Sequence, residues 1–242
     1  MTETPPGIPP ALDAFVVRLR ETAGSGLVAL LAYGSLATGD YVPDVSDVNL
    51  LLVLESADVE TLRRLGPVLR EARRELGVDP FVVTRGELPR VADVFPVKLR
   101  AIRLNHLVLA GENPLDGIEV GREHLRLRTE QALRNHLLRL RRRYLEVQGD
   151  DASLRWLLVR ASGTLFVVLE ALLYLSGHEV PPGGGYAAVG DAAAEHLGLD
   201  AAVLGGMLEL RRGDDVEDPE GLFDGVIALL EAAIGLADGL AS

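Results

Sequence analysis

The stretch Tyr33-Gly34-Ser35, followed after a turn by Ser46-Asp47-Val48-Asn49, decides the fold of this 242-residue chain. The apolar run before it, residues 27–32, is bounded by glycines and suits a buried strand. Glycine lets a backbone approach a phosphate closely, and free N–H groups at a helix start attract anions. The sequence therefore predicts a strand, a phosphate-binding turn at Gly34 and Ser35, and a short helix that opens at residues 36–38.

Two further strands are expected to carry oxygen ligands to this turn. Residues 48–54 are almost entirely apolar and predict a central strand, and residues 77–84 predict another strand, with Asp79 near its start. Because side chains alternate between the faces of a strand, Asp47 and Asn49 are expected to project the same way. If the two strands are neighbours, Asp79 lies in the same cluster as Asp47 and Asn49. Mg²⁺ prefers carboxylate and phosphate oxygens, so this cluster is a candidate magnesium site.

These motifs resemble the DNA polymerase beta-like nucleotidyltransferase superfamily. The resemblance rests on Gly34-Ser35, on Ser46-Asp47-Val48-Asn49 and on the later Asp79. The runs at residues 93–96 and 106–115 look like the stretch that closes this domain in bacterial adenylyltransferase-like proteins. The whole chain is similar to a bacterial group with this domain, a Ser-Asp-x-Asn motif and a helical C-terminal half.

The resemblance implies transfer of a nucleoside monophosphate from a magnesium-bound nucleoside triphosphate, such as ATP, to a hydroxyl group. It implies catalytic roles for Asp47 and Asp79 and nucleotide binding by Gly34, Ser35 and Ser46. In the superfamily, two carboxylates on one strand bridge two metal ions, and a third binds the catalytic metal and assists the attacking hydroxyl. The corresponding metal ligands are Asp47, Asn49 and Asp79.

The chain departs from the superfamily pattern at Asn49, which stands where a carboxylate is expected. Asparagine offers a carbonyl oxygen but no negative charge, so a second divalent ion would be poorly held. The turn is also longer than usual. Asp40 and Asp44 within it are expected first as solvated turn residues, and the alternative is that one of them replaces the missing carboxylate. The favoured interpretation is a weakened or lost transferase. The alternative is an inactive nucleotide-binding, regulatory or antitoxin-like protein.

The sequence predicts an α+β fold, with a mixed sheet and flanking helices at residues 1–117 and an all-helical bundle at residues 118–242. Turn-forming residues between Gly111 and Gly117 mark the boundary. The largest polar pocket is expected between the two domains, at Gly34, Ser35, Asp47 and Asp79. Helices are predicted at residues 9–23, 58–76, 87–105 with a break near 96, 123–148, 152–176, 190–197, 201–212 and 219–237. In the second of these, the inward positions are Leu62, Leu65, Leu69 and Leu76.

Several residues of the helical half have a functional and an ordinary interpretation. The arginines at positions 139 and 141–143 form either a solvated helix face or a basic wall for a triphosphate. Glu130 and Glu170 are candidate general bases, although helix-surface or core-pairing roles are expected first. The histidines show no metal-ligand spacing and are expected at the surface or at helix ends: His106, His124, His136, His178 and His196.

Composition narrows the class of protein further. A net charge of −12 argues against binding of extended nucleic acid, because phosphate contacts dominate that affinity. The chain has no cysteine, no basic-then-apolar leader and no uninterrupted apolar run of membrane-spanning length. We therefore expect a cytoplasmic protein whose partners are a nucleotide and a hydroxyl-bearing small molecule or protein, with a homodimer left open.

Overall fold

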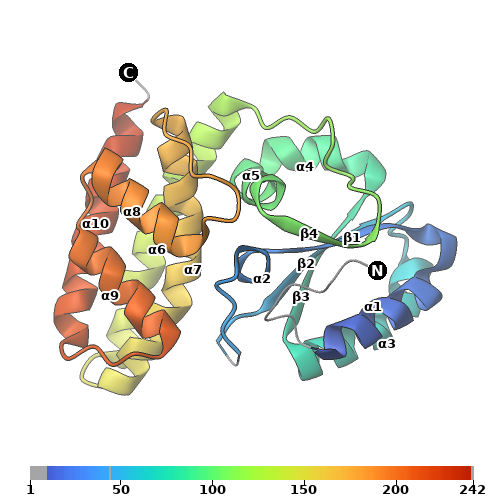
Figure 1. The fold of residues 1–242 in the computed structure, drawn as a ribbon, viewed down its shortest axis with the longest axis horizontal. Coiled ribbons are helices and arrows are strands. Elements are labelled where there is room, and N and C mark those ends of the chain that lie inside the picture. Colours follow the sequence, from blue (N-terminus) through green and yellow to red (C-terminus); the bar gives the residue numbers. More distant parts are fainter. Residues whose placement is uncertain (1–9, 44, 241–242) are drawn as a thin grey trace. The chain divides into compact units, whose positions relative to one another are not determined.

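The computed structural model describes residues 10–43 and 45–240, which fall into two compact units (Figure 1). The N-terminal unit comprises Met1–Val94 and Ile102–Glu119, and the helical unit comprises Phe95–Ala101 and Val120–Ser242. The chain passes into the helical unit for good after Glu119, close to the turn-rich segment that marks the predicted boundary. The predicted helix start at Pro9 and the candidate carboxylate Asp44 lie outside the described residues.

The N-terminal unit is built on a four-stranded mixed sheet, which confirms the predicted fold class. The strands are β1 (Leu27–Tyr33), β2 (Val48–Leu54), β3 (Val78–Thr84) and β4 (His106–Gly111), in the order β3-β2-β1-β4. β2 runs parallel to β3, whereas β1 is antiparallel to both β2 and β4. The apolar sequence of β2 fits its place between two strands, where both faces are covered.

One face of the sheet is covered by α1 (Pro10–Ala23) and α3 (Val59–Leu76), which lie side by side in Figure 1. The core between these helices and the strands is almost entirely aliphatic, and it includes Leu12, Phe15, Leu19, Leu30, Leu50, Leu52 and Leu65. Asp58 caps α3 by accepting a hydrogen bond from the Thr61 N–H. The prediction for Leu62 was wrong: it is 43% exposed, because it points away from the strip of α3 that contacts the sheet.

The remaining elements before residue 122 are short helices and turns. They are α2 (Ser35–Thr38), directly after β1, then α4 (Leu88–Val94) and α5 (Pro96–Leu104), together with the 3-10 turns η1 (Gly24–Gly26) and η2 (Arg85–Glu87). Figure 1 shows α4 on the side of the sheet away from α1 and α3. The predicted break near residue 96 is present, because Pro96 lacks an N–H and starts a new helix.

The helical unit consists mainly of five helices. They are α6 (Arg122–Val147), α7 (Asp151–Leu175), α8 (Gly185–Leu197), α9 (Ala201–Arg212) and α10 (Pro219–Gly239). α7 is long and apolar enough to cross a membrane by length and composition, but 67% of its most apolar window is buried inside the protein, as in a core helix. α8 begins five residues before its predicted start. Tyr186 and Val189 pack into the core, and their burial outweighs the low helix propensity of the glycines.

Candidate functional site

Four polar side chains form a row across one end of the sheet. In the strand registers, Asp79 of β3 is paired with Asn49 of β2, Asn49 with Tyr33 of β1, and Tyr33 with His106 of β4. Side chains of directly paired residues point to the same face of a sheet. The row therefore reads Asp79, Asn49, Tyr33, His106 from one edge of the sheet to the other.

The row lies on the face of the sheet opposite α1 and α3. The residues that follow two of its members, Leu50 in β2 and Leu107 in β4, belong to the core beneath those helices. Because side chains alternate along a strand, Asn49 and His106 point the other way. This end of the sheet is where β1 ends and where β2 and β3 begin, so the turn after β1 leaves directly from the row.

The turn after β1 passes beside Asn49. Gly34 has φ +69° and ψ −145°, a backbone conformation that side chains other than glycine rarely adopt. A Cβ atom placed on Gly34 would lie 3.4 Å from the Asn49 amide nitrogen. Ser35, the first residue of α2, is buried, since its exposed fraction is 4%. The structure therefore brings Gly34, Ser35 and Asn49 together.

Asp47 and Ser46 lie on the segment that leads into β2. Asp47 is exposed, and its backbone carbonyl accepts a long 3.5 Å hydrogen bond from the Asn49 amide. The Ser46 hydroxyl accepts a 3.1 Å hydrogen bond from the Val42 N–H, which closes the turn. Asp40 accepts a 2.6 Å hydrogen bond from the Thr38 hydroxyl, so the carboxylate of Asp40 is engaged at the end of α2.

Asp79 has both a cationic and a phenolic neighbour. Its carboxylate forms a 3.2 Å ion pair with Arg73 of α3, and both side chains are more than half exposed. Burial raises the pKa of Tyr33, and the negative charge of Asp79 raises it further. The charge of Asp79 therefore reaches the phenol of β1 across the position of Asn49.

His106, a histidine expected at the surface or at a helix end, is the fourth member of the row. Its Nδ1 atom lies 2.8 Å from the carbonyl oxygen of Ile102. Because a carbonyl only accepts hydrogen bonds, Nδ1 carries the proton, and the lone pair of the neutral ring is on Nε2. His106 is half-buried rather than fully exposed. The signal that identifies it is its position at the start of β4, level with the end of β1.

The predicted magnesium ligands would suit one ion rather than two. They offer two carboxylates, Asp47 and Asp79, and the neutral amide of Asn49. Among the residues that the structure describes, no three His, Cys, Asp or Glu side chains are grouped to hold a metal. Arg73 also neutralises part of the charge of Asp79. Two charges can hold one Mg²⁺ that arrives with the phosphates of a nucleotide, since those phosphates supply the remaining oxygen ligands.

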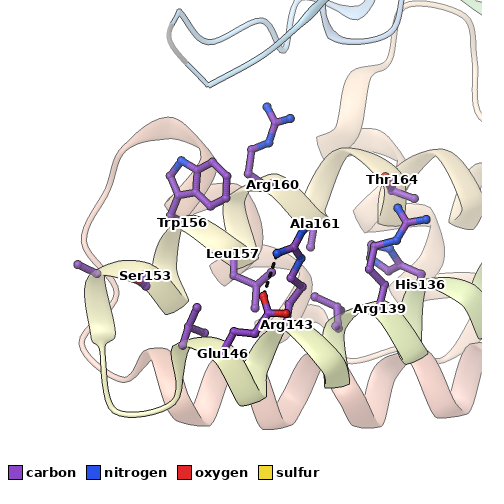
Figure 2. A pocket seen from close by; sticks show the side chains of 13 residues that line it. His136, Arg139, Arg143, Glu146, Ser153, Trp156, Leu157, Arg160, Ala161 and Thr164 are labelled. Atoms are coloured by element: carbon purple, nitrogen blue, oxygen red, sulfur yellow. Dashed lines mark hydrogen bonds and ion pairs between the residues drawn. The ribbon is translucent and has the colours of Figure 1, made fainter.

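The helical unit has a pocket of its own, which Figure 2 shows. All of its lining residues come from α6 and α7, and they include Arg139, Arg143, Trp156 and Arg160. His136 also lines it and is buried, so the expectation of a surface or capping role for His136 was wrong. This imidazole faces the space between two helices, which its position in an arginine-rich sequence does not indicate.

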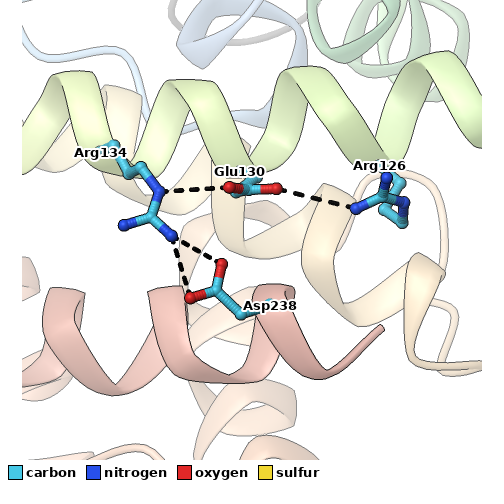
Figure 3. Close-up of polar contacts among 4 residues, drawn as sticks. All are labelled: Arg126, Glu130, Arg134 and Asp238. Carbon is cyan, nitrogen blue, oxygen red and sulfur yellow. Dashed lines mark hydrogen bonds and ion pairs between the residues drawn. The ribbon is translucent and has the colours of Figure 1, made fainter. Parts of the chain in front are cut away.

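The two candidate general bases are held in ion pairs. Glu130 contacts Arg126 at 3.7 Å and Arg134 at 3.2 Å, and Arg134 also binds Asp238 at 2.7 Å (Figure 3). Glu170 is buried and forms a 2.8 Å ion pair with Arg100. Burial raises the pKa of Glu170, although Arg100 opposes the rise. Glu130 is therefore held by two arginines of its own helix α6, and Glu170 links α7 to Arg100 of α5, which agrees with their ordinary interpretation.

Comparisons with known proteins bear on the domain that carries this row. Residues 15–109 match the family model described as "Nucleotidyltransferase domain". This range contains the turn at Gly34 and all four members of the row. A search of proteins with curated function found no match.

The chain is also similar to the crystal structure of spectinomycin adenyltransferase AAD(9) from Enterococcus faecialis with ATP and spectinomycin. The TM-score is 0.59 at 12% sequence identity, and the match covers 96% of this chain and 99% of that chain. At this identity the likeness shows a shared fold, which extends over the helical half as well as the sheet.

Proposed function

We propose that residues 15–109, which match a nucleotidyltransferase domain, belong to the polymerase beta-like superfamily and transfer a nucleoside monophosphate from ATP to a hydroxyl group, at a weakened rate. The observation that carries the proposal is the meeting of the Gly34 turn with the row that contains Asn49 and Asp79. A close backbone turn beside oxygen ligands suits a triphosphate and its cation.

Each group of the site has a distinct role in this proposal. The backbone at Gly34 and Ser35 receives the phosphates, and Ser46 holds the turn that leads to Asp47. Asp47 and Asp79 hold the cation, and Asn49 contributes its carbonyl oxygen. When bound, Mg²⁺ neutralises charge on the phosphates. The acceptor oxygen forms a bond to the α-phosphorus, the bond to pyrophosphate breaks, and the hydroxyl proton leaves to a base or to water.

The acceptor we propose is a hydroxyl-bearing small molecule in the cytoplasm. The similar adenyltransferase was crystallised with spectinomycin, a small molecule, together with ATP. This likeness is one of fold, so it supports the class of acceptor and not its identity. The helical half shares the fold of that protein while differing in sequence, as expected if the two proteins bind different acceptors.

Loss of chemistry with retention of the nucleotide pocket is the second candidate function. The neutral Asn49 and the ion pair between Asp79 and Arg73 favour it, because both reduce the negative charge available to a cation. In that case the protein binds a nucleotide as a regulatory signal, without turnover.

Transfer is tested with ATP labelled at the α-phosphate, Mg²⁺ and a panel of hydroxyl-bearing small molecules that includes spectinomycin. We expect slow label transfer with pyrophosphate release, abolished by Asp47→Asn and unaffected by Asn135→Asp on the exposed face of α6. Calorimetry with ATP and Mg²⁺ accompanies the assay. Magnesium-dependent binding without transfer would favour the regulatory protein, and no binding to the wild type would overturn both candidates.

A further inference from the structure

The pocket of the helical unit has the size of a small-molecule site. Its volume is about 830 Å³, and it lies between the C-terminal half of α6 and the N-terminal half of α7 (Figure 2). Ligand pockets in proteins span roughly 300–1,000 Å³. Its floor is apolar and is formed by Leu140, Val147, Leu157 and Ala161. The other lining residues include three arginines, one glutamate and the small polar residues Ser153 and Thr164.

Positive charge is concentrated in this pocket although the chain as a whole carries −12. Arg139, Arg143 and Arg160 line it, against one carboxylate, Glu146. Glu146 forms a 2.8 Å ion pair with Arg143. Arg139 has no hydrogen-bond or ion-pair partner within residues 10–43 and 45–240. Its guanidinium offers several N–H donors in one plane, an arrangement that suits phosphate or carboxylate oxygens.

The pocket also presents an aromatic surface. The indole of Trp156 lies at its rim and is 64% exposed. The Arg160 guanidinium lies 5.7 Å from the centre of the ring. Leaving a large aromatic side chain in water forgoes the free energy of burying it. A flat ligand that stacked on Trp156 would recover part of that free energy.

A buried histidine lacks its hydrogen bonds at the inner wall of the same pocket. His136 is 5% exposed, and neither of its ring nitrogens has a partner in the described part of the chain. Burial, aided by the charge of Arg139, lowers the pKa of His136 to about 4. At neutral pH the ring therefore has one donor and one acceptor, and buried groups of this kind are usually hydrogen-bonded. A polar ligand that enters beside Arg139, or water ordered by it, would satisfy them.

We propose that this pocket binds a small organic anion that carries a flat aromatic ring. The anionic group is held by Arg139 and Arg143, and the ring stacks on Trp156. The apolar floor contacts the remainder of the ligand. Nucleoside monophosphates and simple aromatic phosphates or carboxylates share this chemistry. The pocket is formed by the helical unit alone, so its occupancy does not depend on transfer at Asp47.

Trp156 is the single tryptophan of the chain and therefore reports directly on the pocket. The probes are phenyl phosphate, inorganic phosphate, phenol and adenosine monophosphate, titrated against the intrinsic fluorescence and, in parallel, by calorimetry. We expect a saturable change with phenyl phosphate, with a Kd at least about tenfold below those of phosphate and phenol, because each of the latter two lacks one of the groups that contact the arginines and the indole.

Two substitutions in α6 distinguish binding in the pocket from a general effect of removing a positive charge. Arg139→Gln should weaken phenyl phosphate binding by about tenfold or more, whereas Arg128→Gln, on the exposed face of the same helix, should leave it unchanged. Asp47→Asn should also leave it unchanged, since Asp47 belongs to the N-terminal unit.

The response to adenosine monophosphate identifies the source of the ligand. Binding that Arg139→Gln weakens and Asp47→Asn does not would assign the pocket to nucleotides, whereas binding of phenyl phosphate alone would assign it to smaller aromatic anions. An unsaturable response to phenyl phosphate, equal affinity for inorganic phosphate, or equal losses in Arg139→Gln and Arg128→Gln would overturn the proposal.

Discussion

Asn49 lies directly opposite Asp79 in the parallel register of β2 and β3, so a neutral amide and a carboxylate stand side by side at the end of the sheet. The Gly34 turn passes the amide on its other side. A carboxylate at position 49 would therefore add its charge between Asp79 and the phosphate-binding turn. Asparagine keeps the shape of the site and lowers its charge.

Asn49→Asp should raise magnesium-dependent affinity for ATP by about tenfold, because a third carboxylate restores attraction for a divalent ion. In the absence of metal, the new charge lies beside Asp79, so the apparent melting temperature should fall and should recover when Mg²⁺ is added. Melting curves with and without Mg²⁺ and ATP measure both effects.

Asn135→Asp adds the same charge on the exposed face of α6 and is the matched control. It should respond to Mg²⁺ and ATP as the wild type does. If Asn49→Asp behaved like this control, the missing charge at position 49 would not be the reason for weak metal binding.

Arg73→Gln should strengthen Mg²⁺ binding with little effect on stability. Arg73 is the cation paired with Asp79, and both side chains are largely exposed, so the pair contributes at most about 1 kcal/mol to folding. Removing the cation leaves the charge of Asp79 free for the metal. Titration of Mg²⁺ in the presence of ATP tests this. Arg64→Gln, exposed on the same helix, should leave the affinity unchanged.

Gly34→Ala should destabilise the protein by about 1–3 kcal/mol, because φ at this position is +69° and ψ is −145°. The added Cβ would lie 3.4 Å from the Asn49 amide nitrogen, an ordinary contact, so the cost arises from the backbone conformation. Gly235→Ala is the control: it lies in α10 with open space around the new Cβ, and should stabilise by up to about 1 kcal/mol. Equal effects in urea unfolding would show that the turn tolerates a side chain.

The sequence predicted the elements of the sheet because their signals are local. Residues 48–54 have the bounds of β2, and the glycine-bounded run at 27–32 differs from β1 by one residue. Asp79 was expected to join Asp47 and Asn49 only if these strands were neighbours, and the strands are neighbours, with Asn49 paired to Asp79. The place of His106 in the row did not follow, because it depends on the register between β1 and β4, which no local signal sets.

Predictions that depended on tertiary contacts were less successful. Leu62 has the helical spacing of a core residue yet is exposed, since α3 buries a strip that excludes it. His136 is surrounded in sequence by arginines yet is buried between helices. Only the position of α7 against α6 determines which of these arginines enclose a pocket and which remain in solvent.

Removing one partner of the buried ion pair between Arg100 and Glu170 should destabilise the protein strongly, whereas replacing both side chains with apolar ones should not. The 2.8 Å contact of this pair leaves the Arg100 Nε and the Glu170 Oε2 without partners among the described residues. Glu170→Leu alone leaves the buried Arg100 cation without its carboxylate, and should lower the free energy of unfolding by about 3–5 kcal/mol. Arg100→Met with Glu170→Leu should be more stable than either single variant. A double variant as unstable as the sum of the single variants would contradict this.

The stability of the protein should fall at acidic pH because of His136. The pKa of the folded protein's imidazole is about 4, against 6.5 in an unfolded chain, so the unfolded state alone takes up a proton between these values. Stability is therefore fully present above pH 6.5 and is lost as the pH falls toward 4. Between pH 7 and pH 5 the expected loss from this group is about 2 kcal/mol. Urea unfolding at the two pH values should show that loss in the wild type and in the control His124→Gln, which removes an exposed imidazole from the same helix. His136→Leu should lose about 2 kcal/mol less, because leucine takes up no proton in either state.

If His136→Leu and the wild type lost the same stability, the imidazole of His136 would be accessible to protons in the folded protein.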